Sequence, residues 1–248
     1  MAVTTLKPEP MTSFEKRIVS LAAEPYRRAG KFALHFAQGK LGQDPVFMEI
    51  LKRGLIAPNS HVVDIGCGQG LLSSWLLAAG HLAEDAAWPT DWQVAPRDVT
   101  VRGLELMPAD VIRAQQALSA HASRFQFNVG DMCSTPFGPA RAVVILDVLH
   151  YVPYAAQDEV LRRVRESLAP KGVLILRIGD AAAGLGFKIS NWVDAVVTQA
   201  RGHRLSRLYC RPLAKWIATL QKLGFQVEST PMSQGTPFAN VLLVARVG

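Results

Sequence analysis

The residues best suited to chemistry lie in Val62–Gly70, where a short apolar run ends in three alternating glycines. Glycine accepts a positive φ and lets a ligand approach bare backbone. The helical-looking Leu71–Leu77 follows at once, and the first N–H groups of a helix have no partner within it. The pattern predicts a strand, a tight turn and a helix that bind a nucleotide-like ligand. The candidate ligand-binding residues here are Asp64, Gly66, Cys67, Gly68 and Gly70.

The glycine spacing and Asp64 indicate which kind of nucleotide is expected. Dinucleotide sites use G-x-G-x-x-G, whereas this chain has G-x-G-x-G with Leu71 at the place of the third glycine. Asp64 precedes the first glycine by two residues, where a carboxylate would repel a pyrophosphate but attract an amino group or a sulfonium. A nicotinamide-dependent oxidoreductase is therefore disfavoured.

At this point the sequence resembles the class I S-adenosylmethionine-dependent methyltransferases, whose first motif is an acidic residue followed by x-G-x-G-x-G. The resemblance extends from about residue 60 to the C-terminus. It implies S-adenosyl-L-methionine as the cofactor. It also implies an α/β fold, a doubly wound, mostly parallel seven-stranded sheet with helices on both faces.

Glu105 follows the second expected strand and is the candidate ligand for the ribose hydroxyls, with Leu106 next to it in the cofactor site. Glu84 and Asp85 stand nearer the family's usual spacing after the glycines. Neither follows a strand, whereas the β-branched run 99–104 delivers Glu105 to the edge of the sheet. The alternative for Glu105 is an exposed carboxylate before a turn.

Asp131 and Met132 end the third strand and resemble the family's adenine motif. There an Asp side chain accepts from the exocyclic amine, and the next backbone N–H donates to the ring. The alternative is ordinary turn chemistry, because Gly-Asp pairs are common in turns.

Asp147, His150 and Tyr151 follow the fourth strand, which in this family ends beside the transferable methyl group. The resemblance therefore places Asp147 at the cofactor and His150 and Tyr151 at the reacting atoms. The ordinary pKa of histidine near 6.5 suits proton removal from an acceptor hydroxyl, so His150 is a candidate general base. The alternative is that His150 only packs or positions its neighbours.

No metal is expected, because a sulfonium already carries its leaving group and methyl transfer mainly needs an aligned nucleophile in a water-poor pocket. The sequence has no H-x-x-x-H, H-E-x-x-H or paired-carboxylate signature. The three cysteines have no C-x-x-C spacing, so neither a disulfide framework nor a thiolate metal site is indicated.

The elements that must position these residues are read from apolar runs and helical periodicity. Strands are predicted near 61–65, 99–104, 125–129, 142–147, 173–177, 225–229 and 240–246. Helices are predicted near 70–80, 108–121, 156–168 and 212–223.

The chain is expected to have two parts. Residues 1–58 form a helical N-terminal extension or cap, and residues 59–248 form the cofactor-binding domain. Thr12 and Glu15 have the spacing of a capping box at the start of the extension. Two stretches, 81–98 and 178–211, do not fit a minimal strand–helix alternation. Long insertions are often functional, and the second is predicted to be a helical insertion that can act as a lid over the acceptor.

The composition fits a single α/β domain with additions, being 49% hydrophobic and 19% charged over 248 residues. The N-terminus lacks a signal-peptide pattern and no apolar run is long enough for a membrane span, so a cytoplasmic location is expected. The net charge of +7 suits either solubility or an anionic partner. The sequence leaves the oligomeric state open.

The acceptor is expected to be a small apolar or aromatic molecule, free or bound to a carrier protein. Residues 147–151 are similar to small-molecule and lipid-type methyltransferases, and 25–41 resembles enzymes of bacterial pigment or fatty-acid-like biosynthesis. A nucleic-acid methyltransferase stays open through the basic run 201–211, although such a run is usually a solvated face. A non-catalytic binding protein with the same fold is a further alternative.

Overall fold

The computed structural model describes residues 11–85, 87–181, 208–232 and 240–248. Seven strands form one sheet in the order β3-β2-β1-β4-β5-β7-β6. All neighbours are parallel except β7, which is antiparallel to both β5 and β6. The strands are β1 (His61–Ile65), β2 (Thr100–Glu105), β3 (Phe125–Val129), β4 (Ala140–Leu146), β5 (Leu168–Gly179), β6 (Phe225–Pro231) and β7 (Asn240–Val247).

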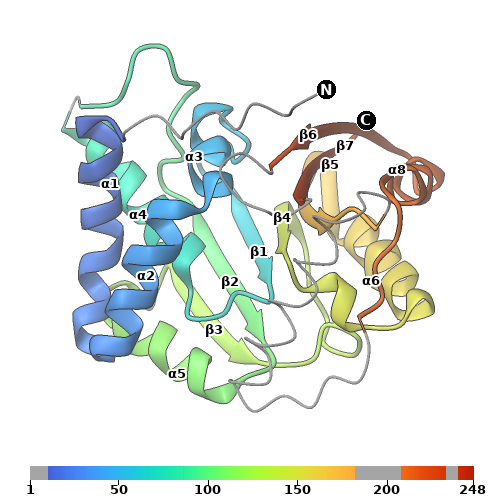
Figure 1. Ribbon diagram of the computed structural model, residues 1–248, viewed down its shortest axis with the longest axis horizontal. Coiled ribbons are helices and arrows are strands. Elements are labelled where there is room, and N and C mark those ends of the chain that lie inside the picture. Colours follow the sequence, from blue (N-terminus) through green and yellow to red (C-terminus); the bar gives the residue numbers. More distant parts are fainter. Residues whose placement is uncertain (1–10, 86, 182–207, 233–239) are drawn as a thin grey trace, which may run out of the picture.

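Helices cover both faces of the sheet (Figure 1). One face carries α1 (Ser13–Ala23), α2 (Lys31–Gln43), α3 (Pro45–Lys52), α4 (Leu71–Glu84) and α5 (Pro108–Ala117). The other carries α6 (Tyr154–Ser167) and α8 (Leu213–Lys222). Short 3-10 turns η1 (Glu24–Ala29), η2 (Ser119–His121) and η3 (Leu149–Tyr151) complete the described elements. The predicted doubly wound α/β architecture is confirmed.

The predicted strands all exist, and the main differences lie at element ends. β5 begins at Leu168, directly after α6, because its first residue pairs with Ala140 before a register shift. The single helix predicted over 108–121 divides instead, since α5 ends at Ala117 and η2 follows as a separate turn. Neither difference moves a predicted site residue away from the carboxyl ends of the strands.

The N-terminal helices share a core with the face of the sheet that they cover. Ile18, Tyr26 and Leu51 are fully or almost fully buried, in the same apolar cluster as Trp75 of α4. The predicted capping box starts α1: Thr12 accepts from the Glu15 N–H at 3.1 Å and donates its own N–H to the Glu15 carboxylate at 3.0 Å. The described part of the extension, residues 11–58, therefore packs as one body with the helices and sheet that follow it.

Buried hydrogen bonds also join this extension to the residues after β1. The Tyr26 hydroxyl donates to the Gln69 carbonyl at 2.9 Å, and the Gln69 amide donates to the Ala33 carbonyl at 2.9 Å. On α4, the Ser74 hydroxyl donates to the Ala22 carbonyl at 2.6 Å. Since buried polar groups are costly to leave unpaired, these bonds fix the N-terminal helices against the glycine turn.

The described residues of the 81–98 stretch pack against the rest of the core. Its first residues extend α4, and the remainder lies beside the amino ends of β1 and β2, where Asn59 donates to the Arg97 carbonyl at 2.8 Å. Trp88 and Trp92 pack edge to face with each other and with Phe14 of α1, at ring-centroid distances of 5.0–5.8 Å. The stretch closes the end of the core opposite to the predicted site.

Most of the predicted 178–211 insertion, residues 182–207, lies outside the described residues, so the predicted lid stays a prediction. Within the described part of the chain, no helix is long and apolar enough to cross a membrane.

Candidate functional site

The glycine turn joins β1 to α4 at the carboxyl edge of the sheet. The N–H groups of Gly66 and Cys67 both donate to the Leu104 carbonyl of β2, at 2.8 and 3.2 Å, which ties the turn to the neighbouring strand. Gly66 has φ +74°, and a Cβ there would lie 2.6 Å from the Val148 methyl groups. Gly68 also has a positive φ, +54°, but nothing lies within 4 Å of a Cβ built on it. Open space beside bare backbone is what a bound ligand requires at Gly68.

Glu105 ends β2 and bridges the two turns of this edge, as the position of the strand predicted. One of its carboxylate oxygens accepts from the Gly68 N–H at 2.9 Å, and the other accepts from the Met107 N–H at 3.0 Å. The two rival carboxylates lie elsewhere: Glu84 is the last residue of α4, and Asp85 forms an ion pair with Arg17 at 3.2 Å. Leu106, next to Glu105, is 56% exposed at the same edge.

Asp64 lies within β1 and is only 4% exposed. Burial is the main cause that raises the pKa of its carboxyl to about 7, and the nearby Glu105 carboxylate adds to the effect. The same burial raises the pKa of the Cys67 thiol well above its usual value. This pair of carboxylates makes the turn favourable for a cation and unfavourable for an anion.

Asp131 and Met132 follow β3 on the loop that leads to β4. The exposed Asp131 accepts from the Cys133 N–H at 2.8 Å, so its carboxylate also shapes its own turn. The Gly130 N–H donates to the Glu105 carbonyl at 2.9 Å, which holds this loop beside the predicted ribose ligand. The two predicted adenine residues and Glu105 therefore lie close together at the carboxyl ends of the neighbouring strands β3 and β2.

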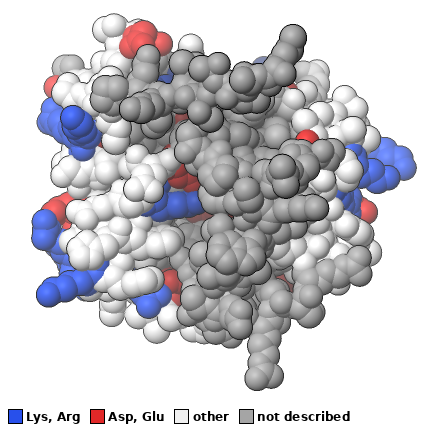
Figure 2. Space-filling model, in the orientation of Figure 1, with Lys and Arg blue, Asp and Glu red and all other residues white. Residues whose placement is uncertain are grey.

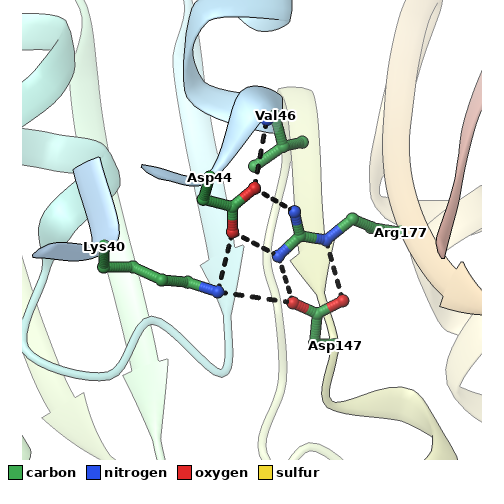
Figure 3. A network of polar contacts seen from close by, with 5 residues as sticks. All are labelled: Lys40, Asp44, Val46, Asp147 and Arg177. Atoms are coloured by element: carbon green, nitrogen blue, oxygen red, sulfur yellow. Dashed lines mark hydrogen bonds and ion pairs between the residues drawn. The ribbon is translucent and has the colours of Figure 1, made fainter. Parts of the chain in front are cut away.

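Asp147 follows β4, but its carboxylate is engaged by a cation that the motifs did not indicate (Figure 3). Both Asp147 oxygens accept from the guanidinium of Arg177 on β5, one of them at 2.8 Å. The same guanidinium donates to both oxygens of Asp44, the N-cap of α3. Lys40 lies 2.7 Å from Asp44 and 3.8 Å from Asp147. The prediction that Asp147 faces a cofactor did not include this pairing.

The charges of this network are compensated although Arg177 is only 2% exposed. Burial alone would lower the pKa of Arg177 and raise that of Asp44. The opposite charges outweigh burial, so the pKa of Arg177 is raised and those of Asp44 and Asp147 are lowered. All three groups are therefore charged near neutral pH, and together they fasten the N-terminal helices to the end of β4.

His150 and Tyr151 lie on η3, directly after the Asp147 turn. His150 is 8% exposed, and its ring packs on that of Tyr151 at a centroid distance of 4.3 Å. Burial lowers the pKa of His150, and Asp147 opposes the shift. The imidazole is therefore neutral at neutral pH, the state that a general base needs before it accepts a proton.

Sequence reasoning missed Arg177 and Asp44 as residues that hold the end of β4. One signal was present for Arg177: a lone arginine within the apolar run 173–178, where a buried charge requires a partner. That partner, Asp44, is 133 residues away in the sequence, so only the structure identifies it. Among the described residues, no group of three or more His, Cys, Asp or Glu side chains could hold a metal ion.

A family model described as "Methyltransferase domain" matches residues 63–174, from β1 into β5. The match includes the glycine turn, Glu105, Asp131 and the Asp147–Tyr151 turn. Residues 63–174, just under half of the chain, therefore match a methyltransferase domain.

The carboxy-S-adenosyl-L-methionine synthase of Chromohalobacter salexigens is 30% identical over 130 residues, which cover 50% of this chain and 43% of that protein. The chain thus matches less than half the length of this curated relative.

Two solved structures share the fold. The magnesium protoporphyrin IX methyltransferase from Synechocystis PCC 6803, with bound SAH, has a TM-score of 0.54 at 19% identity and covers 97% of this chain and 90% of its own. An O-methyltransferase from neocarzinostatin biosynthesis, in complex with S-adenosyl-L-homocysteine and 1,4-dihydroxy-2-naphthoic acid, has a TM-score of 0.56 at 21% identity and covers 94% and 61%.

The buried Asp64 predicts an unusual pH dependence of stability. Between the ordinary carboxyl pKa of about 3.9 and the folded value of about 7, the folded chain holds a proton that the unfolded chain releases. The free energy of unfolding should therefore fall as pH rises across this window, and Asp64→Asn should remove that part of the slope. Urea unfolding at a series of pH values measures the slope of the free energy of unfolding against pH. Asp91→Asn, at an exposed position, controls for the loss of one charge. Parallel profiles for wild type and Asp64→Asn would contradict the assignment.

Arg177→Met should destabilise the protein strongly because it leaves Asp44 and Asp147 without their shared cation. Removing one member of a buried ion pair costs ~3–5 kcal/mol. Adding Asp44→Asn and Asp147→Asn to this variant should recover part of the loss, since no buried carboxylate is then left without a cation and the Lys40 side chain, 39% exposed, can be solvated. Urea unfolding of the single and triple variants tests the network, and a single variant as stable as wild type would refute it.

Proposed function

We propose that this chain transfers a methyl group from S-adenosyl-L-methionine to a hydroxyl of a small apolar or aromatic acceptor, free or bound to a carrier protein. One observation carries the proposal: the carboxyl ends of four neighbouring strands bring the glycine turn, Glu105, Asp131 and His150 to one edge of the sheet. Ligands of open α/β sheets bind at this edge.

The described residues fit this cofactor. We assign Glu105 to the ribose hydroxyls, Asp131 and Met132 to the adenine, and the open backbone at Gly68 to the amino-acid part. Asp64 favours the cationic end of the molecule, and Gly66, Cys67 and Gly70 maintain the turn. When bound, S-adenosyl-L-methionine supplies a methyl group on a sulfonium that carries its own leaving group.

The acceptor side is assigned to His150 and Tyr151, which are close to Asp147 at the end of β4. We assign to His150 the removal of the hydroxyl proton, which its Nδ1 or Nε2 takes as the acceptor oxygen gains the methyl group. We assign Asp147 a positioning role rather than direct contact with the cofactor: its ion pair with Arg177 holds the end of β4, from which His150 and Tyr151 follow. The N-terminal helices, fastened to Asp147 by the network, form one wall of the acceptor pocket in this proposal.

Exposed apolar side chains support an apolar acceptor. Phe32 of α2 is 60% exposed and stacks on Phe36, and Arg113 of α5 lies over its ring at 5.0 Å. Leu106 and Val129, at the ends of β2 and β3, are also more than half exposed. Exposed basic side chains lie along α1 and η1 to α2, the side of the molecule where Figure 2 shows most of the blue atoms. They suit an acidic carrier protein.

Synthesis of carboxy-S-adenosyl-L-methionine is a second candidate, favoured by the 30% identity to the curated synthase. That reaction needs a donor with a carboxyl group. Arg177 and Lys40, two cations beside Asp147, are already paired with Asp44 and Asp147. Methyl transfer is therefore preferred. Mass spectrometry of the adenosyl product distinguishes a demethylated from a carboxylated cofactor.

Glu105→Ala should weaken the binding of S-adenosylhomocysteine while the protein stays folded. The loss of charge-assisted bonds to ribose costs roughly 1.5–3 kcal/mol, or about ten- to a hundredfold in affinity. Isothermal titration calorimetry of wild type, Glu105→Ala and the control Glu84→Ala measures it. A loss at Glu84 with normal binding by Glu105→Ala would overturn the ribose assignment. Thermal stabilisation of the wild type by NAD but not by adenosyl ligands would overturn the function.

His150→Ala should lower turnover by about 10²–10⁴ at unchanged cofactor affinity if His150 is the general base. The wild-type rate should fall as pH drops through the lowered pKa of His150, because the protonated ring cannot accept a proton. His150→Gln controls for packing, and Tyr151→Phe controls for loss of the neighbouring hydroxyl. Rates are measured with a panel of hydroxylated aryl and acyl acceptors. Near-normal turnover of His150→Gln would exclude the base.

A further inference from the structure

We propose that Arg163 of α6 is a positioning residue for adenine recognition, acting through the loop that carries Asp131 and Met132. The inference rests on the proposed function, because it assumes that this loop binds the adenine. It assigns a role to a side chain on another element, beyond the residues proposed to touch the cofactor.

The loop 130–139 has no helix or strand of its own, so its carbonyl groups need partners from outside. The Arg163 guanidinium donates to three of them. One nitrogen bonds the carbonyls of Met132 and Cys133, at 2.9 and 3.0 Å, and the other bonds the carbonyl of Thr135. A single side chain thus provides hydrogen-bond donors for three loop carbonyls, beginning at Met132 of the predicted adenine pair.

Arg163 is itself held in place. Its guanidinium lies over the ring of Phe137 at 4.4 Å, and Phe137 is 4% exposed within the apolar cluster of the α6 face. The flanking residues Val160 and Val164 of α6 are completely buried in the same cluster. A rigid helix therefore presents the guanidinium, whose fixed planar array of donors suits several carbonyls at once.

The consequence for adenine follows from the local bonds of the loop. The Asp131 carboxylate accepts from the Cys133 N–H, and the Asp131 carbonyl accepts from the Thr135 N–H at 2.8 Å. The same two residues, Cys133 and Thr135, are bonded by Arg163 through their carbonyls. The Met132 carbonyl belongs to the same peptide group as the Cys133 N–H, so Arg163 fixes the peptide that orients the Asp131 carboxylate, which is the acceptor proposed for the exocyclic amine. Its bond to the Thr135 carbonyl holds the residue whose N–H closes the turn onto the Asp131 carbonyl.

A purely structural role would also make the loop depend on Arg163, so the test needs a readout of base recognition. S-inosylhomocysteine has a carbonyl oxygen in place of the adenine amine, and Asp131 cannot accept a hydrogen bond from it. The ratio of its dissociation constant to that of S-adenosylhomocysteine therefore reports how well Asp131 is placed, independently of the overall stability.

Arg162 provides a matched control, because it has the same side chain on the same helix but pairs only with Glu159 and Glu166 of α6 among the described residues. Both dissociation constants are measured by calorimetry for wild type, Arg163→Met, Arg163→Lys and Arg162→Met, with thermal unfolding of each. Arg163→Lys keeps the charge with fewer donors, and serves if Arg163→Met does not fold.

Wild type and Arg162→Met should prefer the adenosyl ligand about tenfold or more, the effect of one good hydrogen bond to a charged group. In Arg163→Met the preference should fall to about threefold or less, with Arg163→Lys between the two. An unchanged ratio in a folded Arg163 variant would overturn this inference alone. A wild type that binds S-adenosylhomocysteine but shows no preference would overturn it together with the adenine assignment. A wild type that binds neither ligand would overturn the proposed function itself.

Discussion

The site depends first on the burial of one guanidinium between two carboxylates. Arg177 lies on β5, Asp147 ends β4 and Asp44 begins α3, so a single cation joins the sheet to the N-terminal helices. Burying these charges costs solvation, and an apolar substitute would often be as stable. What the ion pairs add is geometry: a planar guanidinium with two bidentate partners permits one arrangement of α3 against the end of β4. Because His150 and Tyr151 follow Asp147 by a few residues, this arrangement also sets where η3, which carries them, lies.

The glycine turn is held from two sides in a related way. Glu105 accepts from the Gly68 N–H on the open side, while Tyr26 donates to the Gln69 carbonyl on the buried side. A turn with three positive-φ glycines has many conformations available in isolation, and these two bonds remove most of them. The fully buried Tyr26 belongs to the extension, so the extension contributes to the shape of the glycine turn. This explains why helices outside the family match pack without a boundary against those inside it.

The sequence was sufficient where local chemistry decides the structure. The strands, the turn at Gly66 and Gly68, and the position of Glu105 at the end of β2 followed from β-branched runs and the glycine pattern, and the described residues agree. It was insufficient where residues distant in sequence meet. Asp147 has the position of a cofactor ligand, yet Arg177 occupies its carboxylate, and no local pattern pairs Arg177 with Asp44. The packing of the stretch 81–98 was also not predictable from local pattern, because its tryptophans contact Phe14 of α1, more than seventy residues earlier.

Asp64 and Glu105 bring two carboxylates to the same turn, with different surroundings. Glu105 is partly exposed and accepts two backbone N–H groups, which support its charge. Asp64 is buried within a strand and feels Glu105 as a like charge, so its pKa rises to about 7. The folded chain therefore carries an electrostatic cost at neutral pH that an anionic ligand would increase and a cationic one would relieve. This asymmetry, rather than the glycines alone, explains how a turn so similar to that of dinucleotide sites favours a ligand with a cation over one with a pyrophosphate.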